Sequence, residues 1–160
     1  ADLATLNKIG TRLIEIYKTA EGWEVEKGAH ELLAQISNYN IELGIISNFD
    51  ERLETILKAM NLHHYFKFVI TSYSSGFEKP DSQIFNLALS KFGIKPCNAL
   101  HVGNTPEIDY LGAVNAGWNA VLVHHNIRKL SKEYPVINPE HVFQTLADLQ
   151  VHLMKHKVIL

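Results

Sequence analysis

The stretch Ala-Leu-His-Val-Gly-Asn-Thr-Pro-Glu-Ile-Asp, residues 99–109, decides how this chain folds. Its first part is an apolar run, which predicts a short buried strand. Gly103 then permits a tight turn, and Asn104 and Asp109 place an amide and a carboxylate five positions apart after that strand. A turn of this kind is typical of a ligand or metal site. Metal turns usually carry two carboxylates, and this one carries a single carboxylate and an amide.

The same succession of a short apolar run and an amphipathic segment recurs on both sides of this stretch. Further strands are predicted at 43–47, 68–71 and 120–123, and helices are predicted at about 27–37, 53–60, 81–92, 108–117 and from 146 onward. Strands and helices that alternate at this spacing imply right-handed crossovers and a parallel sheet. The strands are apolar throughout, as expected when helices cover both faces of the sheet. The predicted fold is therefore α/β with three layers.

Residues 2–18 form a separate feature at the N-terminus. Leu6, Ile9, Leu13 and Ile16 recur at helical spacing, so this segment is predicted to be an amphipathic helix. The sequence Glu-Gly-Trp-Glu at 21–24 ends it.

Composition excludes several classes of protein. A chain of 160 residues with 46% hydrophobic residues is long enough for one domain with its own core. The net charge of −2 and the scattered lysines and arginines give no footprint for nucleic acid or an acidic membrane surface. No apolar run is long enough to span a bilayer, and the first residues do not read as a signal peptide. The single cysteine, Cys97, excludes an internal disulfide and fits a reducing compartment, so we expect an intracellular protein, cytoplasmic or nuclear.

Polar residues follow three of the predicted strands. Ligands of open parallel sheets bind beyond the carboxyl ends of the strands. Those ends carry Ser47 and Asn48, then a loop that leads to Lys79, then Asn104 with Asp109. A hydroxyl, a lysine and a carboxylate near backbone amides suit an anion, with or without a divalent cation. The alternatives are local: a hydroxyl bonded to its own backbone, a solvated lysine, and an amide that closes the turn.

Three segments resemble the second, third and fourth motifs of haloacid dehalogenase superfamily hydrolases. They are Ile-Ile-Ser-Asn-Phe-Asp at 45–50, Gly-Phe-Glu-Lys-Pro-Asp at 76–81, and His-Val-Gly-Asn at 101–104 continuing to Asp109. The resemblance covers roughly residues 27–150. It implies a phosphatase-type, Rossmann-like core over 21–160 and a remnant of a helical cap over 1–20.

The resemblance also implies roles for single residues. Ser47 matches the hydroxyl that hydrogen-bonds the transferring phosphoryl group, and Lys79 matches the cation that neutralises that group. Asn48, next to Ser47, is expected to bind the phosphate with them. Asn104 and Asp109 match the paired acids that hold Mg²⁺. The expected ligand is a small phosphorylated molecule.

Two departures from the family change this expectation. The family's first motif, Asp-x-Asp, supplies the nucleophile and the general acid, and no such pair occurs among the aspartates of this chain, which lie at 2, 50, 81, 109 and 148. Asn104 replaces an acid in the fourth motif. An amide oxygen brings no charge to a metal, so we expect weak Mg²⁺ binding or none. Covalent phosphoryl transfer needs the missing carboxylates, so this chain is predicted to be inactive as given.

The first strand of the family lies between the strands predicted here at 43–47 and 99–103. We expect these two strands either to pair directly or to have another chain between them. Open strand edges would also favour self-association.

Three functions remain open at this point. The chain is a C-terminal piece of a phosphatase of this superfamily, a non-catalytic binding or regulatory protein on the same fold, or a phosphate-binding module that retains Ser47 and Lys79.

Overall fold

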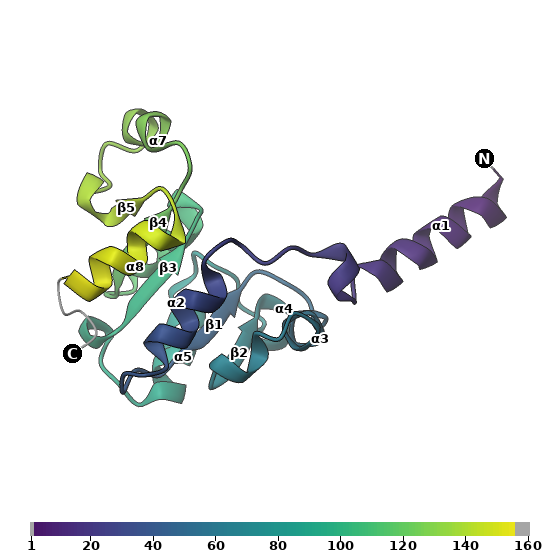
Figure 1. Cartoon of the computed structure of the whole chain (residues 1–160), viewed down its shortest axis with the longest axis horizontal. Helices are drawn as coiled ribbons and strands as arrows, with labels where there is room; N and C mark the ends of the chain where they lie inside the picture. The colour runs from purple at the N-terminus through teal and green to yellow at the C-terminus, as the bar shows by residue number, and fades with distance from the viewer. Residues whose placement is uncertain (1, 156–160) are drawn as a thin grey trace.

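The computed structural model describes residues 2–155 and shows an α/β body from which one helix projects (Figure 1). The strands are β1 (Gly44–Ser47), β2 (Phe68–Thr71), β3 (Leu100–Gly103), β4 (Asn119–Val123) and β5 (Val142–Phe143). The first four lie where the apolar runs predicted them. All pairings between them are parallel, as the alternation with helices required.

The strands form two separate sheets. β1 pairs with β2, and β3, β4 and β5 form the second sheet in that order. The prediction that the strands at 43–47 and 99–103 pair directly is therefore wrong. Within residues 2–155, a side chain meets the free edge of β1, because the Lys79 ammonium donates to the Ile46 carbonyl at 3.0 Å. The alternative, in which another chain lies between these strands, stays a prediction.

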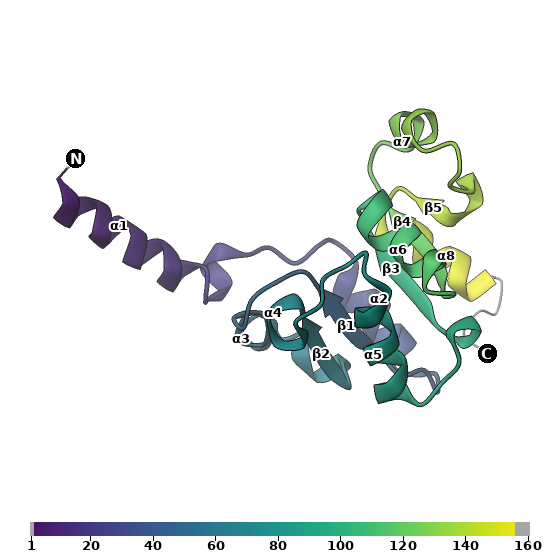
Figure 2. The ribbon, with the colours of Figure 1, turned by 180° about the vertical axis from the view of Figure 1, so that it is seen from behind.

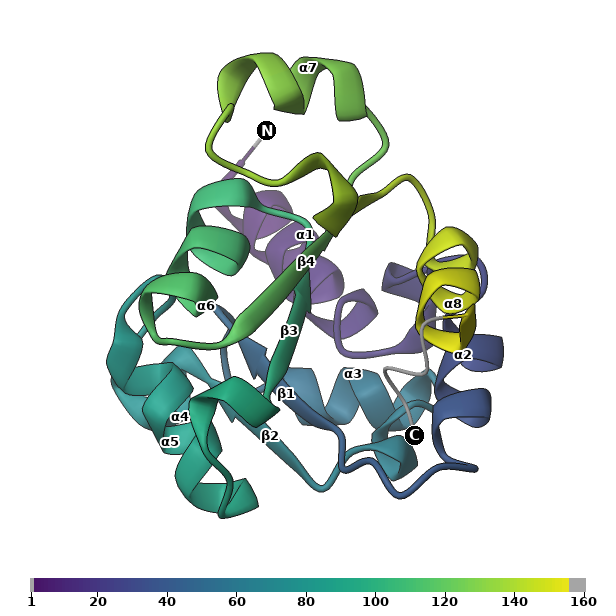
Figure 3. The same cartoon turned by 90° about the vertical axis from the view of Figure 1, so that its left-hand side faces the viewer.

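Helices cover both faces of the strands. Figure 3 shows α2 and α8 on one side, and α5 with α6 on the other. Their bounds are α2 (Ala29–Ile36), α5 (Ser82–Phe92), α6 (Gly112–Asn115) and α8 (Leu146–Lys155). Neighbouring residues of β4 face opposite layers, because Val121 packs with α2 and α8 while Ala120 and Leu122 belong to the cluster around α5. The three-layer prediction is confirmed.

The ends of the covering helices follow local chemistry. Asp81 accepts a hydrogen bond from the backbone N–H of Gln83 and caps α5, and Gly93 ends it with a left-handed φ of 71°. Thr145 and Asp148 cap α8 reciprocally. Both helices begin where the sequence predicted.

The helix predicted over 108–117 differs from the one observed. A π-helical turn, η4 (Pro106–Leu111), comes first, and α6 is only a short α-helical segment after it. A wide turn of this kind is frequent at functional sites. Here it brings the side chain of Asp109 back over the end of β3, as described below. The remaining helical elements are α3 (Leu53–Ala59), α4 (Ser72–Ser75), α7 (Ile127–Glu133), η1 (Ala20–Gly22), η2 (His63–Tyr65), η3 (Pro96–Asn98) and η5 (Pro139–His141).

Helix α1 (Leu3–Ile16) confirms the amphipathic helix predicted at the N-terminus. Asp2 caps it by accepting from the backbone N–H of Thr5 at 2.7 Å. It projects from the body (Figures 1 and 2), and none of its side chains is buried. Leu3 is 78% exposed and Leu6 is 54% exposed. The assignment of residues 1–20 to a cap stays a prediction. None of the helices within residues 2–155 is long and apolar enough to cross a membrane.

Deleting residues 1–16 is expected to change the free energy of unfolding of the body by less than about 0.5 kcal/mol, because apolar groups stabilise a fold only when they are buried. Urea unfolding of the shortened and full chains, followed by far-UV circular dichroism, measures this difference. A loss well above that limit would show that α1 packs on the body in solution.

Candidate functional site

The structure brings two of the predicted site residues into direct contact. Lys79 lies in the loop between α4 and α5, and Asp109 lies in η4 after β3. The Lys79 Nζ atom is 2.6 Å from Asp109 Oδ1, and their side chains are only 10% and 6% exposed. This is a buried ion pair between residues that are 30 positions apart in the chain.

The Asp109 carboxylate is surrounded by donors. Oδ2 accepts from the backbone N–H groups of Asn104, at 3.0 Å, and Thr105, at 2.9 Å. Oδ1 accepts from Lys79 and lies 3.3 Å from Nε2 of His101. An ionised carboxylate can only accept, so Nε2 of His101 carries the hydrogen in this contact. A carboxylate offers about four acceptor positions, and all of them are in use here.

These contacts fix the charge of Asp109. Burial alone would raise the pKa of this carboxyl group. The hydrogen bonds from His101, Lys79 and the backbone of Thr105 outweigh burial and hold its pKa well below the ordinary value. Asp109 is therefore ionised at neutral pH, and it closes the turn that opens at Gly103.

His101 belongs to the site although the sequence interpretation did not include it. Its side chain is buried, with the residue 8% exposed, and its ring lies edge-on to those of Phe85 and Trp118. The one available signal was a polar residue within an otherwise apolar strand. The side-chain contact with Asp109 depends on the π-helical turn, which periodicity did not predict.

Asn48, predicted to bind phosphate, contacts the protein instead. Its Nδ2 donates to the Lys79 carbonyl at 2.9 Å, and the Lys79 backbone N–H donates to its Oδ1 at 2.8 Å. These two bonds fix the lysine loop against the end of β1. Its role as a phosphate ligand is untested and stays a prediction.

Ser47 and Asn104 leave polar groups free at the same edge. Ser47 ends β1, and Asn104 follows β3. Within the described part of the chain, neither side chain has a hydrogen-bond partner. Lys79 also retains capacity, since an ammonium has three hydrogens and two of them are used here. These groups are the ones available to a ligand.

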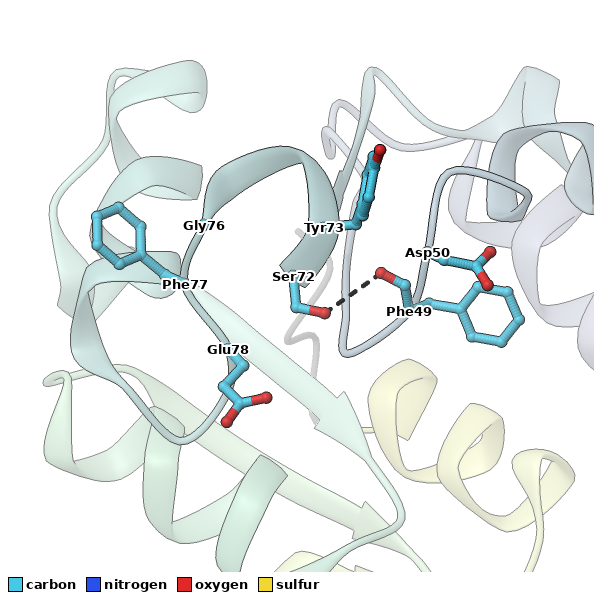
Figure 4. Close-up of a pocket in the computed structure, with 7 residues that line it drawn as sticks. All are labelled: Phe49, Asp50, Ser72, Tyr73, Gly76, Phe77 and Glu78. Atoms are coloured by element: carbon cyan, nitrogen blue, oxygen red, sulfur yellow. Dashed lines mark hydrogen bonds between the residues drawn. The ribbon is translucent and has the colours of Figure 1, made fainter.

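A pocket of about 510 Å³ is lined by chain neighbours of these residues, although Ser47, Lys79 and Asn104 do not line it themselves. Its lining residues flank the site in sequence: Phe49 and Asp50 follow Ser47-Asn48, Gly76–Glu78 precede Lys79, and Ser72 and Tyr73 belong to α4. Figure 4 shows the rings of Phe49 and Phe77 pointing in opposite directions, with Ser72 between their segments. The Ser72 hydroxyl donates to the Phe49 carbonyl at 3.2 Å and joins the two walls.

The residues at this edge do not fit a Mg²⁺ site. Magnesium is usually bound through one or two carboxylates, with water and phosphate oxygens completing an octahedron. Asp109 has no free acceptor position, and Asn104 offers a neutral amide oxygen. No group of three or more His, Cys, Asp or Glu side chains within residues 2–155 is arranged to hold a metal ion.

The parallel α/β core and the lysine–aspartate pair beyond its strand ends agree with the family that the three sequence motifs indicated. The family model for haloacid dehalogenase-like hydrolases matches residues 1–117, and this chain belongs to that family.

Particular relatives make the likeness more specific. The chain is 39% identical to the Rhythmically expressed gene 2 protein of Drosophila melanogaster, over 96% of this chain and 63% of that protein. It is 37% identical to the Haloacid dehalogenase-like hydrolase domain-containing protein 3 of Xenopus laevis, over 90% and 58% respectively. The chain thus spans about three-fifths of the length of these relatives.

Solved structures agree on the fold. The crystal structure of a HAD phosphatase from Thermococcus onnurineus superposes with a TM-score of 0.70 at 25% identity, covering 81% of this chain and 58% of that one. A dehalogenase crystallised as an intermediate complex reaches a TM-score of 0.76 at 24% identity, over 89% of this chain and 61% of that one, which shows the fold alone.

Proposed function

We propose that this chain binds the phosphate group of a small phosphorylated molecule at Lys79 and Ser47 and does not hydrolyse it unaided. One observation carries the proposal: a largely buried ammonium with an unused hydrogen lies at the same sheet edge as the unpartnered Ser47 hydroxyl. The unpartnered Asn104 amide adds a donor at the same edge. Buried charged donors bind anions more strongly than exposed ones, because the surrounding dielectric is lower.

The pocket beside the site suits the organic part of such a molecule. The phosphate would lie at the strand ends, and the rest of the ligand would extend between the loop after β1 and the turn at Gly76. Asn48 holds these two loops together through the Lys79 backbone. Because Asp109 balances the charge of Lys79, we expect weak binding of free phosphate, with a Kd on the order of 1 mM.

We expect no turnover because the carboxylates that phosphoryl transfer requires are not provided. Phosphoryl transfer through a covalent intermediate requires a carboxylate nucleophile in line with phosphorus and an acid for the leaving group. The 160 residues contain no Asp-x-Asp pair, and the carboxylate at the site, Asp109, has all its acceptor positions filled. The chain would act as the C-terminal piece of a phosphatase whose nucleophile comes from elsewhere. The second candidate, a non-catalytic binding protein, is favoured by Asn104, because loss of the first motif alone does not require that change.

Phosphate binding is expected to depend on Lys79. Lys79→Met should weaken binding of inorganic phosphate at least tenfold, because the substitution removes the ammonium of the site while keeping the length of the side chain. Phosphate titrations followed by ¹⁵N–¹H NMR shifts of Ser47, Asn104 and Thr105 measure the affinity. Lys95→Met is the matched control: Lys95 is exposed, lies before the amino end of β3, and should leave the affinity unchanged. Equal affinities for wild type and Lys79→Met would overturn the proposed site.

Hydrolysis of 4-nitrophenyl phosphate by this chain is expected to stay at the uncatalysed rate, with or without Mg²⁺, because the carboxylate that the described residues place at the strand ends, Asp109, has its acceptor positions filled. The assay is release of 4-nitrophenolate over many hours. Turnover that disappears in Lys79→Ala would show that the chain is an enzyme after all.

A further inference from the structure

We infer that the Lys79 ammonium is the cation of this site, because it occupies the oxygen of Asp109 that a divalent metal would need. Phosphate then binds without metal. An acid introduced at position 104 does not by itself create a metal site. That phosphate binds without metal rests on the proposed function. That Lys79 excludes a metal from Asp109 rests on the geometry of the site alone.

The ammonium has the oxygen partners that a small cation would take. It is 2.6 Å from a carboxylate oxygen of Asp109 and 3.0 Å from the backbone carbonyl of Ile46. Carboxylate and carbonyl oxygens are also the ligands of hard divalent cations. One charge therefore already occupies the space between the ends of β1 and β3.

The lysine is held in this place from both sides. Asn48 binds both the N–H and the carbonyl of the Lys79 backbone, so the loop cannot swing away without breaking two hydrogen bonds. The side chain is 10% exposed, and water cannot readily take the place of its partners. A metal on Asp109 would have to displace the ammonium and leave it buried without a counter-charge, which is strongly unfavourable.

Weak metal binding at this site has two possible causes, the amide at position 104 and the ammonium of Lys79. If the amide at 104 were the only obstacle, Asn104→Asp would restore the site. If Lys79 blocks Asp109, Asn104→Asp adds one carboxylate at an exposed position of the turn, but Asp109 stays bonded to Lys79 and cannot act as the second metal ligand. Metal binding then returns only when the ammonium is removed as well.

The test measures Mn²⁺ binding by electron paramagnetic resonance, which counts free Mn²⁺, at neutral pH. The proteins are the wild type, Asn104→Asp, the double variant Asn104→Asp/Lys79→Met, and the control Asn104→Asp/Lys95→Met. Wild type, Asn104→Asp and the control should show no site with a Kd below about 1 mM, and the double variant should bind at least tenfold more tightly than Asn104→Asp. The inference is overturned if the wild type or Asn104→Asp binds Mn²⁺ as tightly as the double variant. It is also overturned if the double variant binds Mn²⁺ no more tightly than Asn104→Asp.

The variant without Lys79 carries a risk to folding, which circular dichroism and urea unfolding would reveal. If it does not fold, Asn104→Asp alone decides: a site with a Kd below about 1 mM overturns the inference, and the lack of such a site supports it.

A second measurement keeps this inference apart from the proposed function. Wild-type affinity for inorganic phosphate should be the same within twofold in EDTA and in 5 mM Mg²⁺, about the resolution of such a titration. A tenfold gain with Mg²⁺ would refute metal-independent binding. If phosphate binds in neither condition, the proposed function fails, while the Mn²⁺ comparison still decides whether Lys79 excludes metal.

Discussion

Asp109→Asn is expected to lower the free energy of unfolding by about 3–5 kcal/mol at pH 7, because it removes one partner of a buried ion pair and leaves the Lys79 ammonium uncompensated. The amide keeps the volume of the side chain, so the loss reports charge and hydrogen bonding rather than a cavity. The NH₂ group of the new amide would also face donors that now bond to the carboxylate. These donors are the backbone N–H groups of Asn104 and Thr105 and the side chains of Lys79 and His101. Urea unfolding at constant salt measures the effect.

The control for this variant is Asp2→Asn. Asp2 is exposed and caps α1, and asparagine caps helices about as well as aspartate, so its expected effect is within about 0.5 kcal/mol. An effect of Asp109→Asn as small as this would mean that the Lys79–Asp109 pair does not stabilise the fold. It would contradict the role given to Asp109 in closing the turn.

The stability that Asp109 provides should depend on pH with a definite sign. Hydrogen bonds and the nearby ammonium lower its pKa in the folded state below the ordinary value of 3.8 that it regains on unfolding. Its contribution is therefore fully present above that value and is lost as pH falls below it, because the unfolded state takes up the proton first. The difference in unfolding free energy between wild type and Asp109→Asn should be constant from pH 7 to 5 and shrink below pH 4. A difference that stays constant down to pH 3 would contradict this.

Gly103→Ala is expected to destabilise the fold by about 3 kcal/mol, because a Cβ atom there has no room. An ideal Cβ on Gly103 would lie 2.3 Å from both Cβ and Cγ of Asp109 and 2.5 Å from its Oδ2 atom. The new methyl group must push the carboxylate off the backbone N–H groups of Asn104 and Thr105. Urea unfolding gives the loss, and the amide hydrogen exchange of these two residues should speed up with it.

Gly10→Ala is the matched control for this change. Nothing lies within 4 Å of a Cβ added at Gly10, which is in the exposed helix α1, so this variant should be neutral or slightly stabilising. Gly103→Ala and Asp109→Asn should also be less than additive, because both act on the same carboxylate. Full additivity would place the effect of Gly103→Ala elsewhere.

The turn at 103–109 is closed by its own carboxylate, which accepts from the backbone N–H groups of Asn104 and Thr105. Its glycine allows the close approach of Asp109, and its backbone φ is not among the left-handed ones. The carboxylate five positions on closes the turn and pairs with Lys79. Asn104 contributes its backbone N–H to this closure and leaves its side chain available. Position 104 therefore carries no charge, and the charge of Asp109 is already balanced by Lys79.

The sequence by itself determined the local structure. Periodicity located β1 to β4, the amphipathic α1 and the capped helix α8, because each depends on side-chain spacing and backbone chemistry within a few residues. The motif spacing also identified Lys79 and Asp109 as members of one site, and the comparison with known families agrees on the family.

The tertiary structure alone decided how those residues are used. That β1 and β3 do not pair, that Asn48 fixes the lysine loop, and that His101 joins the site all depend on contacts between segments far apart in the chain. Whether Asp109 could accept a metal depends on how many donors the fold places around its two oxygens. No pattern in a linear sequence counts those donors, because backbone N–H groups and side chains compete for the same acceptor only once the elements are packed together.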